Sequence, residues 1–546
     1  MSKPSQLRIA GGTVYDPANG VDGMVRDVCI EGERIVADLP AGAPRLDARG
    51  MIVMPGGVDI HAHVAGSSVN HGRRLLPDEH AADPVPAPRL AEGAVSRSGT
   101  GGTIPSTFAT GYRYAGLGYT TAMEAAVAPL AARHAHAELD DTPIIDAGFF
   151  VLLGNDDYLL RQIAAGETAR ARDYAAWLLG ATRGYAIKIV NPGGIARWKS
   201  GAGGPERNVA GLDDPVGSSA VTPRKILETL AGAANALELP HPVHIHCNNL
   251  GQPGNVETTL ASMRALAGRR AHFTHLQFHS YGGERGKNWK SAAKEVIEYV
   301  NTHDEVSADV GQVMFGPATT LTADGPVEHL LYASSGRKWV NVDIELETGC
   351  GIVPYSYKER AAVAALQWGV GLELFLLARD PWRVVLSTDH PNGGSFLSYP
   401  RLIRLLMDRA YRDEQLKRVN QKLLAGSALL DGLAREYTLT EVAIVTRAGP
   451  ARLLGLKTKG HLATGADADV TIYSDDADRA KMFSTPRYVI KAGTLVVEEG
   501  QLRRAPDGRR LAVRPQYDAA VTKDLKRFFD EYASVSFENY GAEPVP

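Results

Sequence analysis

Histidines, a lysine and an aspartate recur at the ends of apolar runs along this sequence. His61 and His63 come directly after the run Ile52–Ile60. In a β-strand, residues i and i+2 point to the same side, so both imidazoles can reach one cation. Imidazole is a common ligand for zinc and related metals. The pair alone is weak support for a metal site, because two surface histidines can have the same spacing.

A lysine lies inside another of these runs. Lys188 is flanked by Ile187 and Ile189. A lysine in a strand usually points to solvent or pairs with a carboxylate, but a strand of a parallel sheet is covered on both faces. Burial favours the neutral amine. A neutral amine can take up carbon dioxide to form a carbamate, whose two oxygens can bridge two cations.

Further candidates lie at the ends of later runs. They are His244, His246, His272, His275 and Asp389. Each has a plain alternative, because a histidine can be an ordinary core or surface residue and an aspartate can cap a loop. Chance would rarely place all of them at the ends of successive apolar runs, so together they indicate one site.

The elements that would position these residues alternate between apolar runs and helical stretches, which is typical of βα units. We count eight runs: Gly57–Val64, Thr120–Val127, Pro143–Leu153, Tyr185–Val190, Pro242–Cys247, His272–His279, Val306–Phe315 and Trp382–Asp389. They predict an α/β fold with a closed (β/α)8 TIM barrel, whose active site lies at the carboxyl ends of the strands. The strand-like run Trp339–Glu347 is not explained by this count.

Short β segments near both chain ends are expected to meet, because neither has enough strands to bury a core alone. The predicted organisation is a small β-sandwich domain shared by residues 1–55 and 441–510, a metal-dependent hydrolase barrel over residues 56–440 and a C-terminal helical arm over residues 511–546. The helix of that arm is expected near Asp518–Tyr532.

Composition excludes several classes of function. The net charge is −3 and the charged fraction is 22%, so neither nucleic acid nor a membrane surface is an expected partner. The first residues lack the apolar core of a signal peptide. Three cysteines are too few and too scattered for a disulfide framework. These features predict a cytoplasmic protein.

The motif Gly57–His63 and the ending Ser387–Pro391 resemble the amidohydrolase superfamily, in particular its two-metal branch with a carboxylated lysine. The resemblance covers roughly residues 5–500. The implied metal ligands are His61, His63, Lys188, His246, His275 and Asp389. His244 and His272 compete for two of these roles, but the other histidine of each pair lies nearer the carboxyl end of its strand.

The resemblance also implies the chemistry. Two divalent metal ions, best suited to zinc, would be bridged by N6-carboxylysine at Lys188 and would lower the pKa of a bridging water. Asp389 would accept the proton of this water as general base and pass it to the leaving amine as general acid. The products would be a carboxylate and an amine.

Four longer stretches resemble the A subunit of formylmethanofuran dehydrogenase: 188–194, 244–251, 274–282 and 388–394. This implies hydrolysis of formylmethanofuran to formate and methanofuran in the one-carbon oxidation of methylotrophic bacteria, with the other subunits of a formyltransferase/hydrolase complex as partners. The Ala- and Arg-rich composition favours the bacterial complex over the archaeal enzyme.

The carrier, methanofuran, has a glutamate-rich tail in this family, so a cationic surface is expected. Arg197, Lys199 and Arg207 are candidates for contact with the tail, although they also fit a solvated basic loop. Arg285 is a candidate for substrate binding, because its guanidinium could hold the formate carboxylate with two hydrogen bonds.

Three alternatives remain open. An archaeal-type formylmethanofuran dehydrogenase subunit would work in the condensing direction. A cyclic-amide hydrolase of hydantoinase or dihydroorotase type would share all six ligands. An assembly scaffold, related to hydantoinases that have lost ligands, is disfavoured because all six positions are filled.

Overall fold

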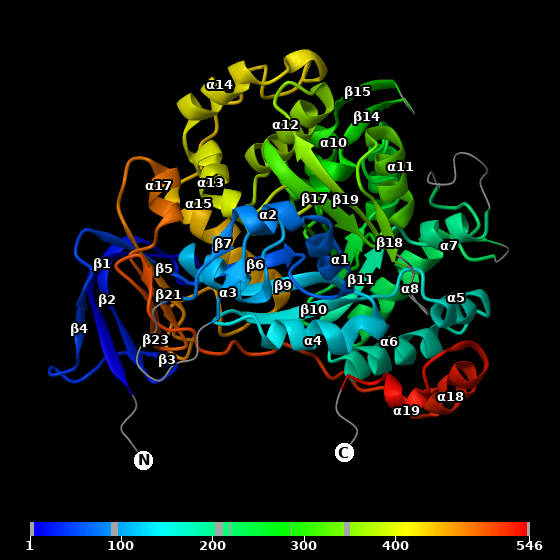
Figure 1. Ribbon diagram of the computed structural model, residues 1–546, viewed down its shortest axis with the longest axis horizontal. Helices are drawn as coiled ribbons and strands as arrows, with labels where there is room; N and C mark the ends of the chain where they lie inside the picture. Colours follow the sequence, from blue (N-terminus) through cyan, green and yellow to red (C-terminus); the bar gives the residue numbers. More distant parts are fainter. Residues whose placement is uncertain are drawn as a thin grey trace.

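Parallel strands form the central sheet of the molecule (Figure 1). The computed structural model describes residues 5–88, 97–201, 211–217, 220–284, 287–342 and 350–542. Within these ranges the sheet has eight strands, each overlapping one predicted run: β6 (Gly57–Ala62), β9 (Tyr119–Val127), β10 (Asp146–Leu152), β11 (Ala186–Val190), β12 (Val243–His246), β13 (Ala271–Phe273), β16 (Val306–Asp309) and β20 (Val384–Val385). The N–H of His63 donates to the carbonyl of His390 after the last strand, at 2.6 Å. The first and last strands therefore meet, and the predicted TIM-type barrel is confirmed.

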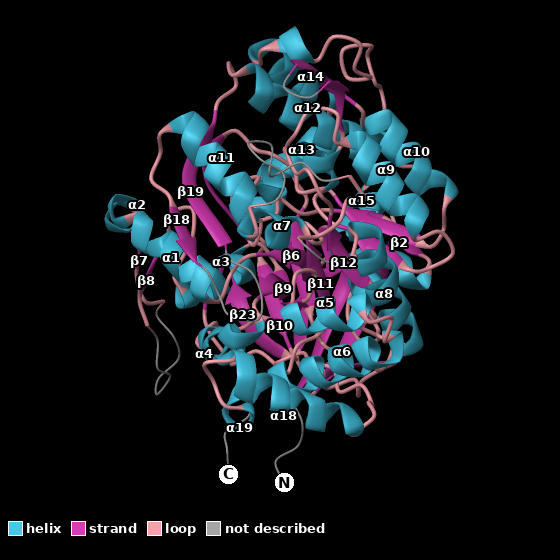
Figure 2. Ribbon diagram, turned by 90° about the vertical axis from the view of Figure 1, so that its right-hand side faces the viewer, coloured by secondary structure: helices cyan, strands magenta, loops and turns pink. Residues whose placement is uncertain are grey.

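Helices cover the outside of this barrel (Figure 2). They include α3 (Thr107–Gly116), α4 (Ala132–Asp140), α5 (Asp157–Ala164), α6 (Thr168–Thr182), α8 (Pro223–Ala236), α9 (Val256–Ala265), α10 (Ala293–Thr302), α12 (Ala362–Leu377), α13 (Tyr399–Met407), α14 (Arg409–Arg418) and α16 (Gly449–Leu454). Helix α12 is apolar nearly all round, and Leu372, Leu374 and Phe375 on it are fully buried. A helix without a polar face must be covered on all sides, and α10 and the chain after α12 cover this one.

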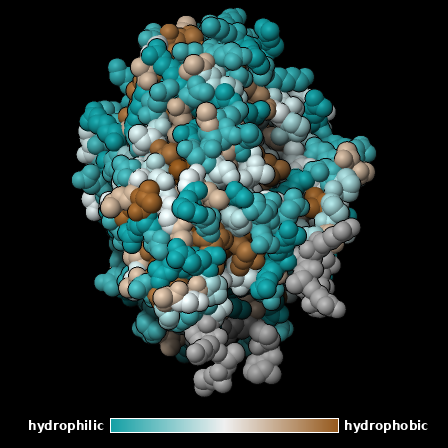
Figure 3. All heavy atoms as spheres, turned by 90° about the vertical axis from the view of Figure 1, so that its left-hand side faces the viewer, coloured by the Kyte–Doolittle hydropathy of each residue, from teal (hydrophilic) through white to brown (hydrophobic). Residues whose placement is uncertain are grey.

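Strands from both ends of the chain pair in a second sheet, as expected. Strand β5 (Met51–Pro55) pairs antiparallel with β21 (Val470–Ser474), and Val53 and Ile472 meet in the small core beneath them. The other strands are β1 (Gln6–Asp16), β2 (Val21–Glu31), β3 (Arg34–Val36), β4 (Arg45–Asp47), β22 (Tyr488–Lys491), β23 (Thr494–Glu498) and β24 (Gln501–Leu502). Figure 3 shows this side of the molecule as largely hydrophilic, with small separate hydrophobic groups.

A three-stranded sheet is inserted between the seventh and eighth barrel strands. It consists of β17 (Gly316–Thr322), β18 (Val340–Val342) and β19 (Cys350–Tyr357), with helix α11 (Gly325–Ser335) between the first two. The run that the strand count did not explain begins with β18, and residues 343–349 of it lie outside the described residues. The insertion therefore adds a wall beside the barrel mouth rather than a ninth barrel strand.

The C-terminal arm contains the predicted helix, which begins at Ala520 and ends at Tyr532 (α18), and a short helix Phe537–Tyr540 (α19). The arm packs on α6, where the Trp177 ring stacks on Phe537 and Tyr540 with centroids 5.4 and 5.6 Å apart. The division of the chain into domains stays a prediction. Among the described residues, no helix is long and apolar enough to cross a membrane.

Candidate metal centre

One cavity at the carboxyl ends of the barrel strands is lined by all six predicted ligands: His61, His63, Lys188, His246, His275 and Asp389. The barrel explains this convergence, because parallel strands present their carboxyl ends on one face. Each of these side chains is buried, with at most 6% of any residue exposed. Burying histidines and charged side chains costs free energy unless they are paired or coordinate an ion, and metal ions suit this group.

The first histidine pair meets the aspartate of the last strand. The Oδ1 atom of Asp389 lies 2.9 Å from Nε2 of His61 and 3.3 Å from Nε2 of His63. The other ring nitrogen of His63, Nδ1, lies 3.1 Å from the carboxylate of Glu124 on β9. A carboxylate behind a histidine fixes the ring and its tautomer, which leaves Nε2 available for a metal.

Lys188 lies in the middle of the group without a partner. Its Nζ makes no hydrogen bond to any described residue, and the side chain is 1% exposed. Burial lowers the pKa of this amine to about 8, although nearby carboxylates act in the opposite direction. A buried, partly neutral and unpaired amine fits the predicted carbamate, which would supply the negative charge that bridges two cations.

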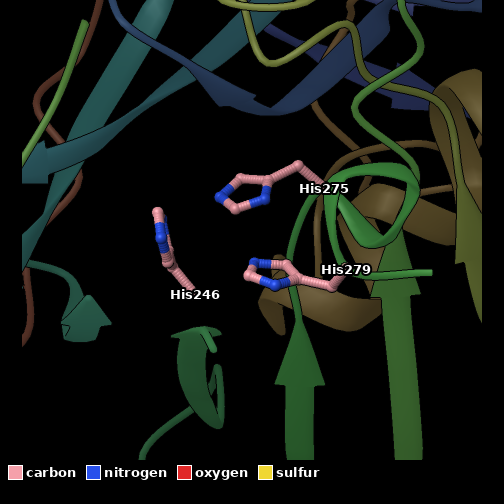
Figure 4. Close-up of side chains that lie close together, drawn as sticks. All are labelled: His246, His275 and His279. Carbon is pink, nitrogen blue, oxygen red and sulfur yellow. The ribbon is translucent and has the colours of Figure 1, made fainter. Parts of the chain in front are cut away.

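His246 and His275 lie with a third imidazole, that of His279 (Figure 4). Ligand atoms of the three rings are all within 4.8 Å of one another. His275 has a positive φ of 37°, and the chain then makes a single turn over Leu276–His279 that brings the third ring alongside. Burial lowers the pKa of all three histidines, which favours the neutral form that metal ligation requires. The residues present therefore fit a metal centre.

Known proteins align with this chain over almost its whole length. Sequences of the Amidohydrolase family match residues 46–497. This chain belongs to the amidohydrolase family. Protein FwdA of Methanocaldococcus jannaschii is 44% identical over 97% of this chain and 96% of its own length. The A subunit of the formyltransferase/hydrolase complex Fhc of Methylorubrum extorquens is 39% identical, over 98% of this chain and 96% of that protein.

A solved structure is similar to this amidohydrolase as well. It is the crystal structure of the formyltransferase/hydrolase complex FhcABCD from Methylorubrum extorquens in complex with methylofuran. The matching chain is 38% identical, with a TM-score of 0.91, and the match covers 98% of this chain and 96% of that one. The predicted resemblance to the family of formylmethanofuran dehydrogenase A subunits is confirmed, and the chain is a hydrolase.

The two competing histidines of this amidohydrolase lie beneath the cavity and do not line it. Nε2 of His244 lies 2.8 Å from Nδ1 of His61, and Nδ1 of His244 lies 3.0 Å from His241. His272 lies between Asp309 and Ser307, at 3.1 and 2.9 Å. These contacts occupy both nitrogens of each ring. The geometry therefore favours His246 and His275, in agreement with their positions along the strands.

Sequence reasoning missed three polar residues that support the site. Glu124 is the only acidic residue in its strand, so the signal that singled out Lys188 could have found it. His279 carried no such signal, because its position depends on the turn after His275. Glu328 lines the cavity from α11, in the insertion that the strand count left unexplained.

The predicted substrate-binding residues are only partly described. Arg285 and Arg207 lie outside the described residues. Arg197 on α7 (Gly194–Lys199) forms an ion pair with Asp214 at 2.8 Å. Its charge is thus partly neutralised within the chain, which weakens its case as a dedicated contact for an anionic tail.

Proposed function

We propose that this amidohydrolase hydrolyses formylmethanofuran to formate and methanofuran as the A subunit of a formyltransferase/hydrolase complex, in one-carbon oxidation of the methylotrophic type. The main support is the cavity on which the six predicted ligands converge. The alignment with the A subunit of the Fhc complex over nearly the whole of both chains supports the choice of substrate and partners.

The six ligands would hold two divalent metal ions, with Lys188 carboxylated between them. Zinc suits a set of imidazole nitrogens and carboxylate oxygens. When bound, such ions supply a water of lowered pKa and polarise the formyl carbonyl. The lowered pKa of His61, His246 and His275 and the unpaired Lys188 support this occupancy.

Asp389 would accept the proton of the attacking water. Burial opposes its ionisation, but His275 and His61 hold its pKa well below the usual range, so it is a carboxylate. Nδ2 of Asn392 donates to Oδ1 of Asp389 at 2.9 Å, and the N–H of Leu321 on β17 donates to the side-chain oxygen Oδ1 of Asn392 at 2.6 Å. The base is therefore oriented by the inserted sheet as well as by the barrel.

The other walls of the cavity suit a formamide on an aromatic carrier. Leu250, Phe278 and Tyr357 also line it and give it apolar sides. A formyl group near the metal ligands would leave the aromatic part of the carrier against these sides.

The test is formate release from formylmethanofuran by the chain purified with its partner subunits, together with metal analysis. We expect turnover and two metal ions per chain. Active protein with one ion or none would overturn the two-metal assignment. Turnover of dihydrouracil or dihydroorotate without formylmethanofuran activity would replace the proposal with a cyclic-amide hydrolase.

The condensing direction is the second candidate, and the 44% identity with FwdA favours it. Because the same groups catalyse a reaction in both directions, the cavity does not distinguish them. Co-purification does: a partner that reduces carbon dioxide would indicate condensation, whereas a formyltransferase partner would indicate hydrolysis.

A further inference from the structure

Glu328 lines the same cavity as the predicted metal ligands. It lies on α11, outside the barrel frame, and is 3% exposed. A glycine makes room for it: a Cβ at Gly351 on β19 would lie only 1.9 Å from the Cβ of Glu328. The insertion thus places an acid, Glu328, in this cavity. The other acid that lines the cavity, Asp389, is one of the predicted metal ligands.

The hydrogen bonds of Thr320 indicate which form this acid takes. Its Oγ1 lies 2.9 Å from Oε2 of Glu328 and 3.0 Å from the carbonyl oxygen of Val353. A hydroxyl has one hydrogen, and a carbonyl can only accept. If Thr320 donates to Val353, the remaining contact is satisfied only when Glu328 donates to Thr320, and this requires a protonated carboxyl.

The surroundings agree with a protonated acid. Among the described residues, no basic side chain forms an ion pair with Glu328. Burial raises the pKa of Glu328 well above its usual range, and the nearby Asp324 and Asp389 raise it further. A carboxylic acid kept neutral in an apolar site can donate a hydrogen bond or a proton to a bound substrate.

We propose that Glu328 is the general acid that protonates the leaving nitrogen of the formamide, while Asp389 takes the proton of the attacking water. This inference rests on the proposed function. It divides between two carboxyls the tasks that Asp389 alone would otherwise perform. The Oδ1 atom of Asp389 is already engaged by His61, His63 and Asn392, at 2.9, 3.3 and 2.9 Å, on the metal side of the cavity.

Two proton transfers accompany the bond changes. Water adds to the formyl carbon, and one of its protons passes to Asp389. The C–N bond then breaks as the proton of Glu328 is transferred to nitrogen, which leaves the amine, formic acid and a Glu328 carboxylate. Formic acid gives its proton to the amine, so that formate and an ammonium group depart. The proton on Asp389 returns to Glu328 through solvent water and restores both groups.

The test compares two leaving groups in the Glu328→Gln variant, with the chain purified with its partner subunits. N-Furfurylformamide releases an amine that must be protonated, whereas phenyl formate releases a phenolate that needs no proton. We expect the variant to lose about 100-fold or more in kcat on the formamide, and less than about 3-fold on the ester after spontaneous hydrolysis is subtracted. Equal losses on both substrates would overturn the proposal.

The amide introduced by Glu328→Gln can donate to Thr320 as the acid does, so the substitution preserves the local contacts. The control is Glu373→Gln on α12. Glu373 is also a buried acid, 2% exposed, but it accepts from Ser291 and lies away from the cavity. This control should leave both rates unchanged, and metal content should be equal in all three proteins. If the wild type hydrolyses none of N-furfurylformamide, phenyl formate and formylmethanofuran, the proposed function itself is wrong, and not only the role of Glu328.

Discussion

Buried charges gather at both ends of the barrel, and the two groups differ in whether the chain neutralises them. At the amino ends of the strands, two lysines lie among three aspartates. We call these five residues the floor cluster: Lys459, Lys491, Asp146, Asp467 and Asp469. Nζ of Lys459 lies 3.1 Å from Asp467 and 2.9 Å from Asp469, and Nζ of Lys491 lies 2.7 Å from Asp146. At the carboxyl ends, Lys188 has no such partner.

The same residue type therefore behaves oppositely at the two ends. Burial opposes the charge of Lys459 too, but three aspartates raise its pKa above the usual range. The pKa of Lys188 falls to about 8. The three aspartates of the floor cluster are close enough to hold a cation, but the lysines already supply the positive charge. A buried cluster of charges that is neutralised by its own residues stabilises the fold. A buried cluster that lacks such counter-charges is available to bind a ligand.

The largest expected effect is at Asp389. Asp389→Asn keeps the size of the side chain but removes the base, so turnover should fall by about a thousandfold or more while metal stays bound. Kinetics of formate release together with metal analysis of the same sample would check this. Full activity in the variant would refute the assignment of Asp389 as the base.

The same substitution at both ends tests the comparison directly. Lys459→Met leaves three buried aspartates without their central cation and should lower the free energy of unfolding by about 3–5 kcal/mol. Lys188→Met removes an amine without a partner, so the metal-free protein should be as stable as the wild type or more so, while bound metal is lost. Urea unfolding of both metal-free variants gives the two values.

Similar losses of stability in the two variants would contradict the comparison, because Lys188 would then have a structural role. Retention of two metal ions by Lys188→Met would contradict the bridging role instead. The two measurements are independent, so each end of the barrel is tested separately.

The barrel and the six candidate ligands were predictable because they depend on local rules. Strand ends follow from apolar runs, and His61 and His63 share a face because alternate residues do. Residues whose position depends on the path of the chain were not predictable: His279 returns to the site after a turn with positive φ at His275, and Glu328 arrives on an insertion. The partners that distinguish His244 from His246 also appear only in three dimensions.

A smaller effect is expected at Glu124, which links the site to the backbone. Its Oε2 accepts from the N–H groups of Val64 and Ala65 at 2.6 and 2.9 Å, while Oε1 faces His63. Glu124→Gln should weaken metal affinity about 10- to 100-fold, because the ring of His63 loses its charged acceptor. Competition with a chelator measures this. Unchanged affinity would show that His63 is oriented by other groups.

The smallest expected effect concerns metal-free protein as the pH falls. The two ends of the barrel should lose stability at different pH values. Burial lowers the pKa of His246 and His275. As the pH falls below about 6.5, the unfolded chain therefore binds protons at these histidines before the folded chain does. Stability at the carboxyl end of the barrel decreases for this reason. The pKa of Asp469 in the floor cluster is lowered as well, although burial opposes this, because Lys491 and Lys459 stabilise the carboxylate. Its contribution is complete above about pH 3.9 and is lost only below that value.

Hydrogen exchange, corrected for the intrinsic pH dependence of the rates, can follow the two ends separately. Between about pH 6.5 and 5, exchange should accelerate in β12, which ends at His246, and in β13, which ends two residues before His275. It should remain slow in β21, which begins beside Asp469. Metal-loaded protein should lose this difference, because bound ions hold the histidines in their neutral form. Simultaneous loosening of both ends in metal-free protein would mean that the two clusters are not independent. In that case the metal centre would be as stable as the floor cluster and would not be a separate, less stable end of the barrel.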